Sequence, residues 1–162
     1  MTNALTLTVE PGSQTMYFSR EFDAPAHRVF RAHVEPELVA RWLGPLMFEM
    51  VVDHFDARTG GSYRYRHINP DNKEEYGFFG SFHEVTPNER IVQTFEFAGM
   101  PGHPAIETMT LEELEGGRCR LLGTSTFITV EDLDSMVNSD MESGMVESYE
   151  RLEETVKNAA LP

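Results

Sequence analysis

The sequence predicts an α+β fold: a curved, seven-stranded antiparallel sheet around one long C-terminal helix, with two short helices after the first strand. Three observations support this prediction. Apolar and polar residues alternate with a period of two through the middle of the chain, short turn signals separate these stretches, and helical spacing returns near the C-terminus. The short connections favour antiparallel hairpins. A sheet must bury its apolar face, and only the C-terminal helix is long enough to cover it.

The first predicted strand covers residues 16–22 and leads into a helical pattern. Asp23 is the expected N-cap of the first helix, because its side chain can accept a hydrogen bond from a free backbone N–H. Pro25 lies near the first helical turn, where its missing N–H costs nothing. Residues 36–42 predict a second short helix, which ends at Gly44 and the proline after it.

The rest of the chain predicts six strands and one helix. The expected strands are residues 48–55, 62–68, 75–85, 90–97, 106–114 and 118–127. Between Glu131 and about Asn158 no Gly-Pro breaker occurs, and apolar residues recur at helical spacing. A helix of about 28 residues would be roughly 40 Å long.

Length and composition indicate one domain. The chain has 162 residues, of which 40% are hydrophobic, so a core is feasible without disulfides or metals. Residues 1–14 read as a weakly ordered lead-in, and residues 15–162 as a single domain. We expect a cytoplasmic protein, because Cys119 has no second cysteine to pair with and residues 1–12 lack the pattern of a secretory signal.

The charge of the chain excludes some partners. Its 13 Lys and Arg against 27 Asp and Glu give a formal net charge of −14, which repels polyanions, so nucleic acid is not an expected partner. Anionic membrane surfaces are disfavoured for the same reason. No stretch approaches the roughly 18 apolar residues of a membrane span, so membrane insertion is not expected.

Several local strings occur in the order typical of one known family. They are Phe22-Asp23-Ala24-Pro25, Glu35-Pro36-Glu37-Leu38, Arg41-Trp42-Leu43-Gly44-Pro45, Gly60-Gly61-Ser62-Tyr63-Arg64-Tyr65, Gly80-Ser81-Phe82-His83-Glu84-Val85-Thr86-Pro87, Glu89-Arg90-Ile91-Val92 and Ser143-Gly144-Met145. With these strings the chain resembles the SRPBCC (START-like, Bet v-like) helix-grip superfamily from Thr15 to Val156. Within it, the chain is similar to the branch of homologues of the C-terminal domain of the 90-kDa heat-shock chaperone's ATPase activator.

The resemblance implies a helix-grip fold, a chaperone partner and a role in the stress response. It also leaves a homodimer open, since some members of the superfamily are dimers. The chain departs from its branch at Met145, where members usually have Trp. A flexible thioether in place of a rigid indole changes what a groove beside the helix can hold.

A pocket between sheet and helix follows from geometry, because a concave sheet and a straight helix cannot touch along their whole length. Its expected lining combines inward strand positions with one stripe of the terminal helix. The expected ligand-binding residues are His33, Tyr63, Tyr65, His67, Phe79, His83, Gln93, Phe95, Glu107, Met109, Leu121, Gly123, Val137, Met141, Gly144, Met145 and Ser148, with Phe97 and Leu111 on the same wall. The same Met and Phe stripes also fit a plain core.

Three of these residues are candidates for acid–base chemistry. His83, Glu107 and Tyr65 would share the apolar pocket, where burial moves the pKa values of histidine and glutamate toward neutrality. That chemistry would suit an aromatase/cyclase-like or hydrolase-like enzyme acting on a polyketide-like substrate. Each could equally be a satisfied core or rim residue, and a one-residue bulge near Gly80 would turn His83 to solvent.

The sequence predicts no metal site and no cofactor. Asp53, His54 and Asp56 are possible ligands, but Asp53 and His54 point to opposite faces of a strand. No paired-cysteine motif, phosphate loop or nucleophile elbow is present. The first functional hypothesis is therefore binding of a small apolar or amphipathic molecule. An enzyme of the kind described above and a chaperone-ATPase-activating module are the alternatives.

Overall fold

A computed structural model describes residues 3–158, which contain eight strands and four helices. In chain order these are β1 (Thr6–Val9), β2 (Thr15–Phe22), α1 (Ala26–Val34), α2 (Pro36–Trp42), β3 (Glu49–Phe55), β4 (Ser62–Ile68), β5 (Glu75–Thr86), β6 (Arg90–Phe97), β7 (Ala105–Leu114), β8 (Arg118–Phe127), α3 (Val130–Val137) and α4 (Met141–Lys157).

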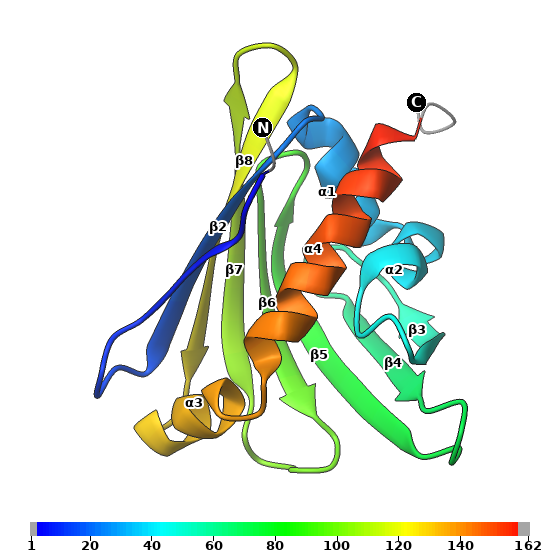
Figure 1. Cartoon of the computed structure of the whole chain (residues 1–162), viewed down its shortest axis with the longest axis vertical. Coiled ribbons are helices and arrows are strands. Elements are labelled where there is room, and N and C mark those ends of the chain that lie inside the picture. The colour runs from blue at the N-terminus through cyan, green and yellow to red at the C-terminus, as the bar shows by residue number, and fades with distance from the viewer. Residues whose placement is uncertain (1–2, 159–162) are drawn as a thin grey trace.

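The eight strands form one antiparallel sheet in the order β1-β2-β8-β7-β6-β5-β4-β3. Figure 1 shows α4 crossing the concave face of this sheet, with α1 and α2 beside its C-terminal half and α3 near its start. The hairpins of the β3–β8 meander keep sequence neighbours adjacent, and β8 then pairs with β2. This α+β arrangement agrees with the predicted class.

Two local expectations at the N-terminal end were wrong. Residues Thr6–Val9, expected in the weakly ordered lead-in, pair with β2 as an eighth strand. Asp23 does not cap α1: the N-cap position is Pro25, without a side-chain hydrogen bond. The Asp23 carboxylate instead accepts a hydrogen bond from Arg118 Nε at 2.9 Å. Tertiary partners outside the local sequence decided both outcomes.

The single terminal helix of the prediction is two helices. α3 ends at Val137, α4 begins at Met141, and Asp140 between them has a φ of 61°. That left-handed conformation suits Asp better than most residues, and it redirects the chain without a Gly or Pro. The 17 residues of α4 span about 25 Å at 1.5 Å per residue, well short of the predicted length.

The C-terminal half of α4 packs against the sheet. Leu152 and Val156 are fully buried, and they pack in one core cluster with Phe22 and Leu121 of the sheet. A smaller cluster, centred on Leu133, lies under α3. The core therefore fills the space beneath α3 and beneath the end of α4, and not the space beneath the start of α4.

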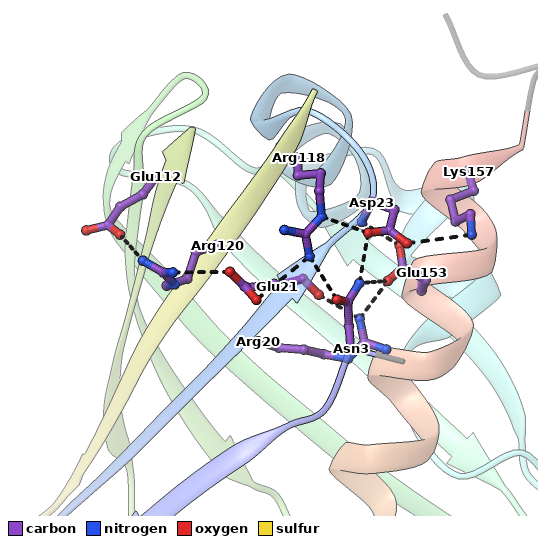
Figure 2. Close-up of polar contacts among 9 residues, drawn as sticks. All are labelled: Asn3, Arg20, Glu21, Asp23, Glu112, Arg118, Arg120, Glu153 and Lys157. Atoms are coloured by element: carbon purple, nitrogen blue, oxygen red, sulfur yellow. Dashed lines mark hydrogen bonds and ion pairs between the residues drawn. The ribbon is translucent and has the colours of Figure 1, made fainter. Parts of the chain in front are cut away.

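A polar network also holds this half of α4 against the sheet (Figure 2). The carboxylate of Glu153 on α4 accepts hydrogen bonds from Arg20 Nη1 at 3.1 Å, from Asn3 Nδ2 at 2.7 Å and from the backbone N–H of Asp23 at 2.9 Å. Arg118 of β8 bridges to Asp23 and Asn3. The network joins the N-terminal segment, β2, β8 and α4 at one end of the molecule.

Candidate functional site

A cavity of about 720 Å³ lies between the concave face of the sheet and the N-terminal half of α4. Met141, Gly144, Met145, Ser148 and Tyr149 are the residues of α4 that line it. Gly144 lines the cavity, and a Cβ added to it would meet no atom within 4 Å. The small residue on the helix thus leaves the volume open.

Aromatic rings form much of the cavity wall. Phe78 stacks on Phe95 and on Tyr65, with 5.4 Å between ring centroids in each pair. From the other side, Trp42 of α2 stacks on Tyr149 of α4 at 6.0 Å. These stacked pairs hold the rings in place around an apolar space, as in a ligand pocket.

The loop after α2 closes one side of the cavity. Gly44 donates its backbone N–H to Ser148 Oγ at 3.0 Å, which ties the loop to α4. Gly44 has a φ of 96°, and a Cβ there would clash with the ring of His67. Glycine is therefore required at this position both for the turn and for the close approach of the histidine.

A polar cluster on the sheet wall is centred on Glu107 of β7. Its carboxylate accepts hydrogen bonds from Gln93 Nε2 at 3.1 Å and from Ser125 Oγ at 3.3 Å. Gln93 also donates to the hydroxyl of Tyr63 at 3.4 Å. Burial raises the pKa of Glu107, and the hydrogen bonds from Gln93 and Ser125 oppose that shift. This cluster can orient a polar group inside an otherwise apolar space.

Two histidines in the cavity wall are held in the neutral form. Burial lowers the pKa of His33 to about 4, and it likewise lowers the pKa of His67 to about 4, with a smaller contribution from Arg151. His33 Nδ1 lies 2.7 Å from the carbonyl oxygen of Val29. A neutral ring donates there, so its Nε2 is a hydrogen-bond acceptor.

Twelve of the seventeen expected site residues line the cavity. They are His33, Tyr63, Tyr65, His67, Gln93, Phe95, Glu107, Met109, Met141, Gly144, Met145 and Ser148. Phe97 lines it too, whereas Leu111 is buried in the core cluster.

Phe79 and His83 lie on the outer face of the sheet instead. Tyr65 is paired with Phe78, so the neighbouring Phe79 points outward, where the guanidinium of Arg64 lies 4.6 Å from its ring centroid. His83 is exposed, and the pairing register between β5 and β6 shifts at this residue. The acid–base pair expected from His83 and Glu107 is therefore not assembled.

Leu121, Gly123 and Val137 also lie outside the cavity lining. Leu121 is fully buried beneath α4. A Cβ on Gly123 would clash with the ring of Phe18, so the space expected over this glycine is already filled. Val137 is exposed at the end of α3 because the helix breaks just after it.

Several lining residues escaped the sequence analysis, among them Phe18, Trp42, Phe78, Phe82, Ser125 and Tyr149. Tyr149 was within reach of prediction, because it lies four residues after Met145 on the expected helix stripe. Phe78 could not be distinguished from Phe79 by periodicity. Nothing in the local sequence of Trp42 indicates that its ring faces α4.

The β6–β7 loop meets α3 at the cavity wall. His103 of the loop and Asp132 of α3 both line the cavity, and His103 Nδ1 lies 2.9 Å from Asp132 Oδ1. The backbone N–H of Asp132 donates to Thr129 Oγ1 at the helix N-cap. The contact between His103 and Asp132 holds the loop against the helix.

Among residues 3–158, no helix has the length and apolar character needed to cross a membrane. No group of three or more His, Cys, Asp or Glu side chains in the same range is placed to hold a metal ion.

An antiparallel sheet curved around a C-terminal helix, with an apolar cavity between them, is consistent with the helix-grip class of proteins. The family model described as "Activator of Hsp90 ATPase homolog 1-like protein" matches residues 23–157, and the chain belongs to this family. Membership supports roles in ligand binding or of the chaperone-ATPase-activator kind.

Solved structures share the fold. Protein CV1439 from Chromobacterium violaceum is 30% identical, with a TM-score of 0.77 over 89% of this chain and 98% of that one. A Rhodobacter sphaeroides protein is 25% identical, with a TM-score of 0.85 over 98% and 100%. An AHSA1-like protein from Aeromonas hydrophila, at 18% identity, has a TM-score of 0.67 over 91% and 96%. Among curated proteins, none matches this chain.

Proposed function

We propose that this protein binds a small apolar or amphipathic molecule in the cavity between the sheet and α4. The observation that carries the proposal is the cavity itself: about 720 Å³, within the range of sites for small molecules. Aromatic rings and methionines supply an apolar lining, and the cluster around Glu107 supplies a few polar groups. This combination of surfaces is typical of ligand sites.

The helix side of the cavity suits an adaptable ligand site. Met141 and Met145 line the cavity near Gly144, and methionine side chains adjust their shape to irregular partners. The C-terminal half of α4 is fixed by Leu152 and Glu153. The site thus combines a rigid support with a pliable wall.

Filling the cavity from the helix tests the proposal. We expect Gly144→Trp to weaken binding of Nile red, an uncharged hydrophobic dye, at least tenfold, because the indole would occupy the ligand's volume. Val146→Trp is the matched control, since Val146 is exposed on the same helix and does not line the cavity. Equal dye binding by Gly144→Trp and the unaltered protein, with both folded by circular dichroism, would contradict the proposal.

A chaperone-activating role is a second candidate, favoured by the family match over residues 23–157. It requires a protein-binding surface and no cavity. Stimulation of the ATPase activity of a 90-kDa heat-shock chaperone, retained by Gly144→Trp, would separate this role from ligand binding.

A further inference from the structure

The cavity lining contains carboxylates but no Lys or Arg among the described residues. Three carboxylates line it, those of Glu107, Asp132 and Asp140, and no Lys or Arg does so within the described part of the chain. His33 and His67 in the wall are neutral near pH 7, because burial lowers the pKa of each to about 4. An occupant of this cavity therefore meets carboxylates, and the basic side chain in contact with one of them is His103, beside Asp132.

The basic residues nearest to this region in the fold lie outside the lining. Arg20, on the inner face of β2, is bound to Glu153 at 3.1 Å. Arg151 of α4 contributes to the lowered pKa of His67 but does not line the cavity. Neither guanidinium neutralises Glu107, whose hydrogen-bond partners are the uncharged side chains of Gln93 and Ser125.

Two residues of the cavity lining carry a polar group without a hydrogen-bond partner. The side chain of Tyr65 is 5% exposed, and its hydroxyl has no hydrogen-bond partner among residues 3–158. Asp132 Oδ1 contacts His103, but Asp132 Oδ2 is buried and unpartnered. A buried carboxylate oxygen without a donor is costly, and a positive charge in the adjacent cavity would lower that cost.

The rest of the wall also favours a cation. The faces of aromatic rings attract positive charge, most strongly in Trp and Tyr, and Trp42, Tyr65, Phe78 and Tyr149 surround the space. An anionic ligand would face three carboxylates and no Lys or Arg. A neutral ligand would leave Glu107 with only its uncharged partners, Gln93 and Ser125.

We propose that this cavity selects an organic cation, a protonated amine or quaternary ammonium group on an apolar body, over uncharged or anionic molecules of the same shape. The inference rests on the proposed ligand-binding function and adds the charge of the ligand. The ammonium group lies among Glu107, Asp132 and the aromatic faces, and the apolar body lies against the methionines of α4.

A matched ligand series tests this selectivity. Calorimetric titration with phenylhexylamine, phenylhexanol and phenylhexanoate is made near pH 7 in 0.15 M salt, where exposed charges are screened over about 8 Å. We expect the amine to bind at least tenfold more tightly than the alcohol, and the carboxylate more weakly than either. Glu107→Gln and Asp132→Asn should each lower the amine-to-alcohol ratio at least threefold.

Glu115→Gln is the control, since it removes the same charge from the exposed turn between β7 and β8. Equal or tighter binding of the alcohol would overturn the charge selectivity and leave the ligand-binding function intact. If Glu107→Gln and Asp132→Asn leave the preference for the amine unchanged, the preference comes from the net charge of the protein, and our inference is wrong. Failure of Nile red and of all three ligands to bind would instead refute the proposed function itself.

Discussion

Replacing Glu153 by alanine removes one carboxylate that serves three donors. Arg20 Nη1, Asn3 Nδ2 and the backbone N–H of Asp23 lie 3.1, 2.7 and 2.9 Å from its oxygens. The pair with Arg20 is a buried one, since the two side chains are only 5% and 15% exposed. In the variant Arg20 keeps its hydrogen bond to the carbonyl of Glu21 and loses its counter-ion.

The magnitude follows from that burial. Breaking a buried ion pair by removing one partner costs about 3–5 kcal/mol, because the remaining charge stays desolvated. A domain of this size loses roughly 2–4 °C of Tm per kcal/mol, so the melting temperature should fall by about 6–20 °C. A surface ion pair would give about 1 kcal/mol or less.

Urea denaturation followed by circular dichroism measures the free energy of unfolding for each variant. Glu154→Ala is the matched control: Glu154 is exposed on the next position of α4 and has no ion pair or hydrogen bond within the described chain, so we expect a change within about 0.5 kcal/mol. Replacing Arg20 and Glu153 together by methionine should recover at least half of the loss, because no unpaired charge remains. A loss below about 1 kcal/mol for Glu153→Ala would refute the reasoning.

Two further predictions concern buried titratable groups. The pKa values of His33 and His67 are about 4 in the folded protein, against the usual value of 6.5. Between these pH values the unfolded chain therefore binds more protons than the folded protein. The free energy of unfolding should decrease as the pH falls from about 6.5 to 4. Glu107, whose pKa is raised, changes the free energy of unfolding with pH in the opposite direction, so the comparison is made in the Glu107→Gln background. Adding His33→Gln to Glu107→Gln should reduce the slope of the free energy of unfolding against pH by about half. Identical slopes for the two variants would contradict this account. Burial raises the pKa of Cys119 to about 12, so its thiol should react with a disulfide reagent only on unfolding, and rapid reaction of the folded protein would be the contrary result.

Local periodicity accounts for the part of the fold that the sequence predicted. The bounds of β4, β6, β8 and α2 agree with the predicted ranges residue for residue. Each has a clear alternation or helical spacing and a turn signal at both ends. Where the pattern was ambiguous, it failed: Phe78 and Phe79 are equally apolar, and only pairing with β4 placed Phe78 inside.

Contacts between distant segments decided the rest. β1 is a strand because β2 is beside it, and the left-handed Asp140 ends one helix and starts another without any Gly or Pro.

By itself, the sequence determined an α+β chain with an apolar sheet face and a covering helix, and it named a minority of the residues that line the cavity between them. The tertiary structure alone decided that Gly144 faces open space, whereas the space over Gly123 is occupied by the ring of Phe18. It also placed Glu107 beside the uncharged side chains of Gln93 and Ser125 in a lining without Lys or Arg. The physical reason is that alternation records which face a residue occupies, whereas volume and charge balance depend on side chains brought together from several strands and helices.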